Sequence, residues 1–153
     1  MAGWDHVHNL MVELGDLMDL PQVSEYSDEN AWHLVTEAGS IEVDYDDGGD
    51  RILLTMPIGM PDSSALEAVY ESLLVHNGAL PASGGVRAGL EEPGGEVVLV
   101  REQPATGLDA ASLRQLVEDL IGSAEAWRAR LRDLPASASV KGSNAFRPDF
   151  IRG

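Results

Sequence analysis

The acidic run Asp44-Tyr-Asp-Asp-Gly-Gly-Asp50 is the part of this sequence whose residue types come nearest to a metal site. Carboxylate oxygens are the ligands that Ca²⁺ prefers, and a calcium loop begun at Asp44 would place Gly49 at its glycine position. The loop's last position needs a bidentate glutamate, but the residue there is Thr55. The segments on either side alternate as strands do, so we interpret the run as a solvated β-turn.

The histidines do not suggest a metal site either. His6 and His8 flank Val7, and residues at that spacing do not share one face of a helix. A zinc site needs several converging ligands, whereas His33 and His76 lie in other predicted elements. We interpret these histidines as surface or boundary residues and expect no metal.

Catalytic and nucleotide-binding patterns are not found. Gly84-Gly85 and Gly94-Gly95 lack the Gly-Lys-Ser/Thr sequence of a phosphate loop, and both suit turns at the start of a strand. The serines have no nucleophile-elbow context, and the absence of cysteine excludes thiolate chemistry and disulfides. We therefore expect a protein that is not an enzyme and carries no cofactor.

Charge narrows the possible partners. The 153 residues include 26 acidic and 10 basic ones, giving a formal net charge of −16. A chain this acidic repels phosphate backbones and anionic lipid surfaces, so we expect no binding to nucleic acid or membrane. A membrane-crossing apolar run and a basic-then-apolar secretory signal are both missing, so a cytoplasmic location is expected.

Hydrophobic periodicity in the first half predicts one helix and three strands. Apolar residues at three-and-four spacing give a helix from Trp4 to Asp19, which Pro21 ends. A polar connector is expected over residues 22–30. Alternating segments separated by glycine-containing turns then predict an antiparallel meander. Its strands are expected at residues 31–37, 40–46 and 51–58.

The second half of the sequence predicts two further helices and two further strands. A capping box, Ser64 to Glu67, opens a helix whose apolar stripe ends at Leu73-Leu74. Strands follow at residues 86–90 and 97–100, and Asp109 is the predicted N-cap of a last amphipathic helix ending near Leu131. The order α-β-β-β-α-β-β-α predicts an α+β fold with helices packed on an antiparallel sheet.

Residues 1–134 are expected to form one domain, followed by a small and polar C-terminal tail over residues 135–153. The last part, Phe146 to Arg152, contains two aromatics and two arginines. Such a segment either frays or docks onto something, and the sequence leaves both open. Trp127 continues the stripe of the last helix and is a predicted core residue, whereas Trp4 and Trp32 suit either a core or an interaction surface.

The second half resembles the class I type III secretion chaperones, the Tir-chaperone family. The resemblance rests on a helix with Leu73-Leu74 and Asn77 near its end, a glycine-rich turn, and a strand reading Val97-Val-Leu-Val100. It continues with Leu108-Asp109 opening a helix that reads Ala124-Glu-Ala-Trp127 near its end. Residues 1–134 would then be the secretion-chaperone-like domain.

The resemblance implies a homodimeric, ATP-independent chaperone in the bacterial cytoplasm. It would bind the N-terminal segment of a secreted effector, keep that segment soluble and non-globular, and direct it to the secretion apparatus. The expected dimer contacts are Leu66, Val69, Tyr70, Leu73 and Val86. The expected effector contacts are Leu10, Leu14, Trp32, Leu34 and Val35. Three alternatives stay open: a regulatory protein of the same fold that sequesters a transcriptional anti-activator, an oligomeric scaffold outside secretion, and, more distantly, an enzyme.

Overall fold

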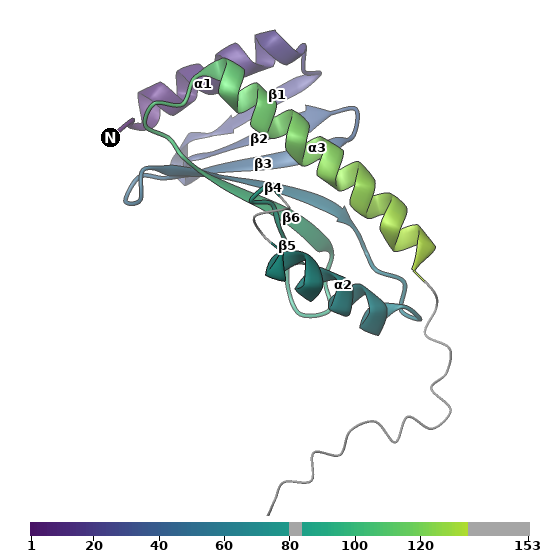
Figure 1. The fold of residues 1–153 in the computed structure, drawn as a ribbon. Helices are drawn as coiled ribbons and strands as arrows, with labels where there is room; N and C mark the ends of the chain where they lie inside the picture. The colour runs from purple at the N-terminus through teal and green to yellow at the C-terminus, as the bar shows by residue number, and fades with distance from the viewer. Residues whose placement is uncertain (80–83, 135–153) are drawn as a thin grey trace, which may run out of the picture.

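A computed structural model of the chain describes residues 1–79 and 84–134. It shows an α+β fold in which helices lie on one face of a single sheet (Figure 1). The elements in chain order are α1 (Trp4–Met18), β1 (Gln22–Tyr26), a 3₁₀ turn (Ser27–Glu29), β2 (Ala31–Thr36), β3 (Gly39–Asp46), β4 (Arg51–Gly59), α2 (Leu66–Gly78), β5 (Arg87–Leu90), β6 (Val97–Pro104) and α3 (Ala110–Asp133). None of the helices described is long and apolar enough to span a bilayer.

The sheet has six strands in the order β1-β2-β3-β4-β6-β5, and every neighbouring pair is antiparallel. Strands β2, β3 and β4 form the predicted meander. The ladder between β4 and β6 shifts register between Pro57 and Gly59, because proline has no N–H to donate to the ladder.

Strand β1 corrects one expectation from the sequence. Residues 22–26 are not a connector but an edge strand, which pairs with β2 in a register that sets Val23 opposite Leu34. Most of its side chains are exposed, so backbone hydrogen bonds hold it rather than burial. Asn30, in the left-handed conformation at φ 53°, closes the 3₁₀ turn that leads back into β2.

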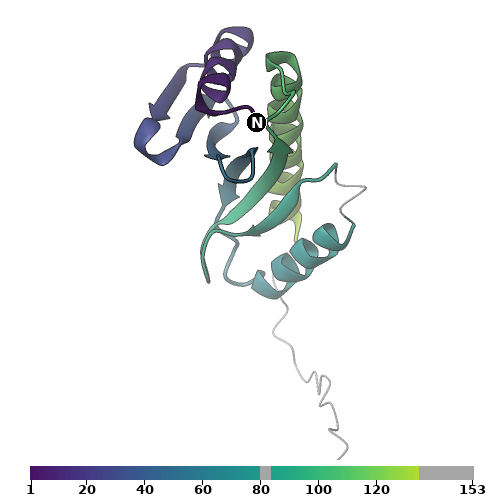
Figure 2. The same cartoon turned by 90° about the vertical axis from the view of Figure 1, so that its left-hand side faces the viewer.

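The core lies between the sheet and the helices. Figures 1 and 2 show α1 and α3 on the same face of the sheet, while α2 lies at the far end beside β5. Alternate residues of the strands point into this layer, for example Ile41, Val43 and Tyr45 of β3. Trp127 is buried, as predicted, and Trp32 is a core residue whose ring stacks on Trp4 at 4.3 Å between centroids.

The helix ends show which capping predictions were right. Asp109 caps α3 by accepting a hydrogen bond from the Ser112 N–H at 2.7 Å, as predicted. The capping box at Ser64 is wrong, because α2 begins at Leu66 and its N-cap, Ala65, makes no side-chain cap. The Asp62 carboxylate instead accepts from the N–H and hydroxyl of Ser64, forming a turn before the helix. The predicted tail, 135–153, lies outside the described residues.

Candidate functional site

The acidic run at the β3–β4 turn is a structural turn. Asp46 accepts hydrogen bonds from Arg51 and from the Gly49 N–H. The bond from Arg51 is the main reason that the pKa of Asp46 lies below its usual value, and the bond from Gly49 adds to the effect. Asp50 accepts from the hydroxyl of Thr106, from Tyr45 and from the Ala2 N–H. These bonds lower the pKa of Asp50, and the bond from Thr106 has the largest effect. The Asp50 carboxylate therefore ties the chain's start and the β6–α3 loop to the sheet, whereas Asp46 closes the turn itself.

Side chains that could ligate a metal do not cluster. In the part of the chain that the structure describes, no group of three or more His, Asp or Glu residues is placed to hold an ion. His6 bonds to the Leu108 carbonyl, and His8 pairs with Glu25 at 2.6 Å.

Helix α2 carries four of the five predicted dimer contacts. Val69 and Leu73 are buried in the monomer, as is Val86 just before β5, while Leu66 and Tyr70 are half-buried. The next residues along the helix point outward: Leu74 is 73% exposed and Val75 is 62% exposed. Large apolar side chains so exposed are typical of a surface that another chain covers.

The C-terminal end of α2 also closes one edge of the sheet. The Asn77 amide donates to the Ala88 carbonyl at 2.7 Å and accepts from the Ala88 N–H at 2.9 Å. The His76 ring bonds to the Val86 carbonyl at 2.8 Å and packs edge-on against Trp127. Together these side chains occupy backbone groups that edge strand β5 would otherwise present to another strand.

The opposite edge, β1, differs. Within residues 1–79 and 84–134, β1 pairs only with β2, so its outer backbone groups face no other strand. Edge strands of this kind are templates for an added strand. Among the described residues, the β5 edge is thus partly occupied by α2, whereas the β1 edge is available for an added strand.

An apolar groove of about 340 Å³ runs between α1 and β1, beside the available edge. Gly15 brings the helix close to the strand, because a Cβ there would lie 3.2 Å from the Val23 side chain. Val12 and Val23 are exposed along the groove, and Trp32 forms part of its wall. The groove is lined by Met11, Val12, Gly15, Asp16, Leu20, Val23, Glu25 and Trp32.

The predicted effector contacts lie mostly beneath this surface. Leu10, Leu14, Trp32 and Leu34 are buried in the core, and Val35 is half-buried on the face of the sheet that no helix covers. Periodicity identified the right elements, α1 and β2. It did not identify two residues that line the groove: Val12, which lies off the apolar stripe of α1, and Val23, which lies in the segment expected to be a connector.

The uncovered face of the sheet is acidic. Burial raises the pKa of Asp44, and the nearby charges of Glu42 and Glu29 add to the effect. A shallow pocket of about 300 Å³ on this face places Glu42 and Glu91 beside the apolar side chains of Leu90 and Val98. This face suits basic and apolar side chains better than anionic ones.

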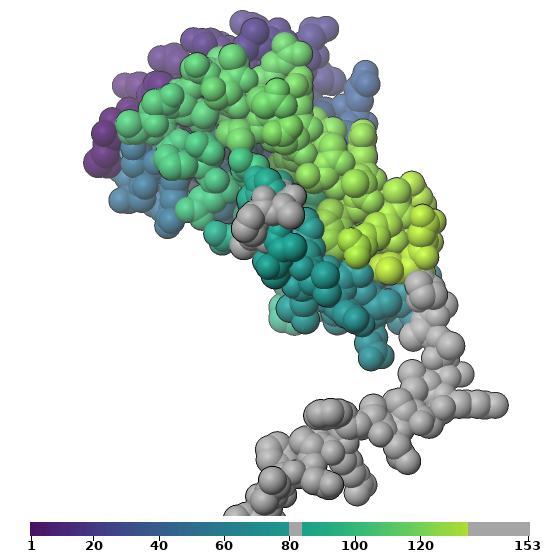
Figure 3. Space-filling view, viewed as in Figure 1, coloured from purple at the N-terminus to yellow at the C-terminus, as the bar shows by residue number. Residues whose placement is uncertain are grey.

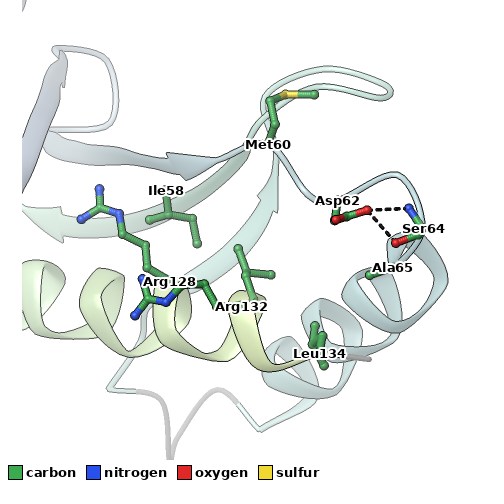
Figure 4. Close-up of a pocket in the computed structure, with 9 residues that line it drawn as sticks. Ile58, Met60, Asp62, Ser64, Ala65, Arg128, Arg132 and Leu134 are labelled. Carbon is green, nitrogen blue, oxygen red and sulfur yellow. Dashed lines mark hydrogen bonds between the residues drawn. The ribbon is translucent and has the colours of Figure 1, made fainter. Parts of the chain in front are cut away.

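A different pocket, of about 450 Å³, lies between the start of α2 and the end of α3. Figure 4 shows Arg128 and Arg132 on one side of it and the Asp62–Ser64 turn on the other. Arg128 reaches across to the carbonyls of Ala38 and Pro57, so it ties the helix to two strands of the sheet. Three of the pocket's polar side chains, those of Arg128, Asp62 and Ser64, are thus used in holding the fold.

A family model for the Tir chaperone protein (CesT) family matches residues 12–128, most of the chain. This chain belongs to that family. The match confirms the resemblance to class I secretion chaperones, and the family is one of chaperones rather than enzymes.

Solved structures share the CesT-type fold at low identity. A chain of the ExsC–ExsE complex is 19% identical with a TM-score of 0.72, and the match covers 90% of this chain and 100% of that one. The Yersinia pestis type III secretion chaperone SycH, solved with a fragment of YscM2, is 13% identical with a TM-score of 0.61, covering 77% and 96%. The fold extends to Escherichia coli YbjN, a putative transcription regulator, at 17% identity and a TM-score of 0.59, covering 84% and 92%. No curated protein sequence matches this chain significantly.

Proposed function

We propose that this CesT-family protein is a homodimeric, ATP-independent chaperone of the bacterial cytoplasm. It binds the N-terminal segment of a type III secreted effector, keeps that segment soluble and non-globular, and directs it to the secretion apparatus. The observation that carries the proposal is the available β1 edge beside the apolar α1–β1 groove. The chaperone–effector complexes among its structural neighbours, HopA1–SchA for one, support it.

An extended peptide suits this surface for physical reasons. Added alongside β1, it would exchange backbone hydrogen bonds with the strand, which gives affinity with little dependence on sequence. Alternate side chains of the peptide would enter the groove and supply selectivity. The net charge of −16 favours segments that carry lysine or arginine.

Four of the five residues predicted to contact the effector take a revised place in this proposal. Leu10, Leu14, Trp32 and Leu34 are buried in the core, so polar substitutions there would act first on stability. The groove itself is tested better through Val12 and Val23, which are already exposed.

A tagged protein recovered from its own host under secretion-inducing conditions should retain an effector through the effector's N-terminal region. A Val12→Asp/Val23→Asp variant should lose that partner while keeping its circular dichroism spectrum. The matched control is Leu17→Asp, an exposed apolar residue on α1 outside the groove lining, which should retain the partner. Equal recovery by all three proteins would refute this site.

Dimerisation is proposed through the outer surface of α2. The predicted contacts Leu66, Val69, Tyr70, Leu73 and Val86 lie on the same end of the molecule as exposed Leu74 and Val75. A Leu74→Arg/Val75→Arg variant should sediment as a folded monomer, whereas Leu17→Arg should remain a dimer. A double variant that stays dimeric would contradict this assignment.

A regulatory role is the second candidate. The same fold occurs in YbjN, described as a putative transcription regulator, which supports a regulatory role. In this alternative the chain would sequester an anti-activator. Recovery of a small cytosolic regulator in the same experiment, in place of a secreted protein, would favour this alternative.

A further inference from the structure

A second groove lies across the α1–β1 corner from the first, and the two share Leu20. Its volume is about 500 Å³, and it lies where the end of α1, the β2–β3 turn and the middle of α3 meet. These three segments adjoin at the upper right of Figure 3. Its lining consists of Met18, Asp19, Leu20, Pro21, Thr36, Glu37, Ala38, Ile121 and Glu125.

The groove combines an apolar floor with an uncompensated acidic rim. Met18, Leu20 and Ile121 are half-buried in its floor. The carboxylates of Asp19, Glu37 and Glu125 are exposed. None of them forms an ion pair with any residue that the structure describes. No basic side chain lines the groove, so its chemistry calls for an occupant with aromatic or aliphatic residues flanked by cations.

The chain's own C-terminal segment has that chemistry. Phe146 to Arg152 carries Phe146, Phe150 and Ile151 together with Arg147 and Arg152. The residues after Leu134 have a net charge of +2, whereas the rest of the chain has −18. The attraction between the two parts is therefore built into the sequence.

The length of the tail also matches the distance from Leu134 to the groove. The described chain ends at Leu134, just past the end of α3, whereas Ile121 and Glu125 lie further back on that helix. The helical rise puts these residues about 14–20 Å from Leu134 along the axis. The eleven residues 135–145, mostly small and polar, separate Leu134 from Phe146. A chain of that length spans about 18 Å on average.

The pocket between the start of α2 and the end of α3 is nearer to the tail but matches its chemistry less well. It begins at Leu134 itself, and exposed Arg132 on its α3 side would repel the arginines of the tail. In the α1–β1 groove, one of the two acidic residues, Glu25, already pairs with His8. The acidic groove is thus the one whose charges are unpaired and whose position fits the length of the tail.

We propose that Phe146–Arg152 docks within the same chain into the groove lined by Asp19, Glu37, Ile121 and Glu125. An aromatic ring of the segment covers the floor, and its arginines pair with the carboxylates of the rim. The contact shields an exposed apolar groove with a segment of the chain itself. If the proposed function holds, it also sets the tail beside the effector groove, where a basic effector segment would compete with it.

Paramagnetic broadening in the full-length chain tests the docking without any effector, so its result is independent of the proposed function. The natural sequence has no cysteine, so Ser143→Cys provides a single attachment point for a nitroxide. Amide signals of Asp19, Glu37 and Ile121 should lose intensity in the oxidised sample and recover on reduction. Arg147→Glu/Arg152→Glu should abolish that loss while leaving broadening near Leu134.

Charge reversal on the groove provides the second arm. Glu37→Lys/Glu125→Lys should also abolish the broadening at Asp19 and Ile121. The matched control Glu67→Lys/Glu71→Lys, exposed acids of α2 outside the groove, should leave it unchanged. Should the groove variant fail to fold, the tail variant still decides, because its substitutions lie outside the described fold.

Three results would overturn the proposal. One is broadening confined to the end of α3, and another is groove broadening that survives both charge reversals. The third comes from a mixture of spin-labelled chains with isotope-labelled chains lacking the nitroxide. Broadening of the groove signals in that mixture can come only from another chain. If a second sample, in which chains carrying both labels are diluted with unlabelled chains, shows no such broadening, the tail docks on a partner chain.

Discussion

Replacing Asn77 by alanine tests whether α2 stabilises the sheet by closing its β5 edge. The substitution removes two hydrogen bonds, of 2.7 and 2.9 Å, to the backbone of Ala88. Ala88 is only 5% exposed, so water cannot readily replace the lost partners. At about 0.5–1.5 kcal/mol of net stability per hydrogen bond, the expected loss is about 1–3 kcal/mol.

Urea unfolding followed by circular dichroism measures this loss. With a denaturant slope of about 1–3 kcal/mol per molar urea, the midpoint should fall by about 1 M. All variants are compared at one protein concentration, because dimerisation would couple to unfolding. The Ala88 amide should also exchange its hydrogen faster in the variant than in the parent protein.

Glu71→Ala is the matched control on the same helix. Its side chain is exposed, and an exposed substitution away from special features changes stability by less than about 0.5 kcal/mol. Asn77→Asp keeps the acceptor for the Ala88 N–H but faces the Ala88 carbonyl with a carboxylate, so it should also destabilise. If Asn77→Ala behaved like Glu71→Ala and the Ala88 amide kept its protection, the two bonds would not be stabilising the edge.

Trp32→Ala should lower the free energy of unfolding in urea by about 3–5 kcal/mol, because the ring is fully buried and stacked on Trp4. A smaller loss would show that neighbouring side chains move in to fill the cavity. Asp50→Asn should destabilise the protein at neutral pH. The pKa of Asp50 is lowered in the fold, so its contribution is complete above the unfolded pKa and disappears as pH falls through the folded one. Midpoints of the parent and variant should therefore converge on acidification, and a constant gap would contradict this. Gly39→Ala should lower the free energy of unfolding by about 1–3 kcal/mol and with it the melting temperature, since φ is +132° and a Cβ would lie 3.1 Å from the Arg128 guanidinium. An unchanged melting temperature would show that the turn adjusts without strain.

The sequence was sufficient for elements whose burial follows a regular period. Ile41, Val43 and Tyr45 alternate with polar residues, which predicts a strand with one covered face, and β3 has that form. Strand β1 could not be predicted in this way, because its side chains are mostly exposed and only backbone pairing holds it. Its existence depends on β2 being in place.

The candidate surfaces were harder to predict for a related reason. Leu73 and Leu74 have equal hydrophobicity, yet one is buried and the other is 73% exposed, because neighbouring residues on a helix point in different directions. Leu10 and Leu14 are buried because α1 packs against α3, a helix about a hundred residues away in sequence. Tertiary packing, which a single stripe does not show, divides apolar residues between core and interface.

The unequal edges of the sheet limit how many molecules can join through it. Growth into a filament by strand pairing needs two binding edges per molecule, one to accept and one to offer. Among the described residues, His76 and Asn77 of α2 occupy backbone groups of Val86 and Ala88 along the β5 edge, which leaves β1 as the more open edge for an added strand. Once a strand pairs with β1, whether from a partner or from a second copy, the occupied groups at β5 oppose further growth. If the proposed function holds, the protein can therefore offer one edge to an extended segment without starting a polymer.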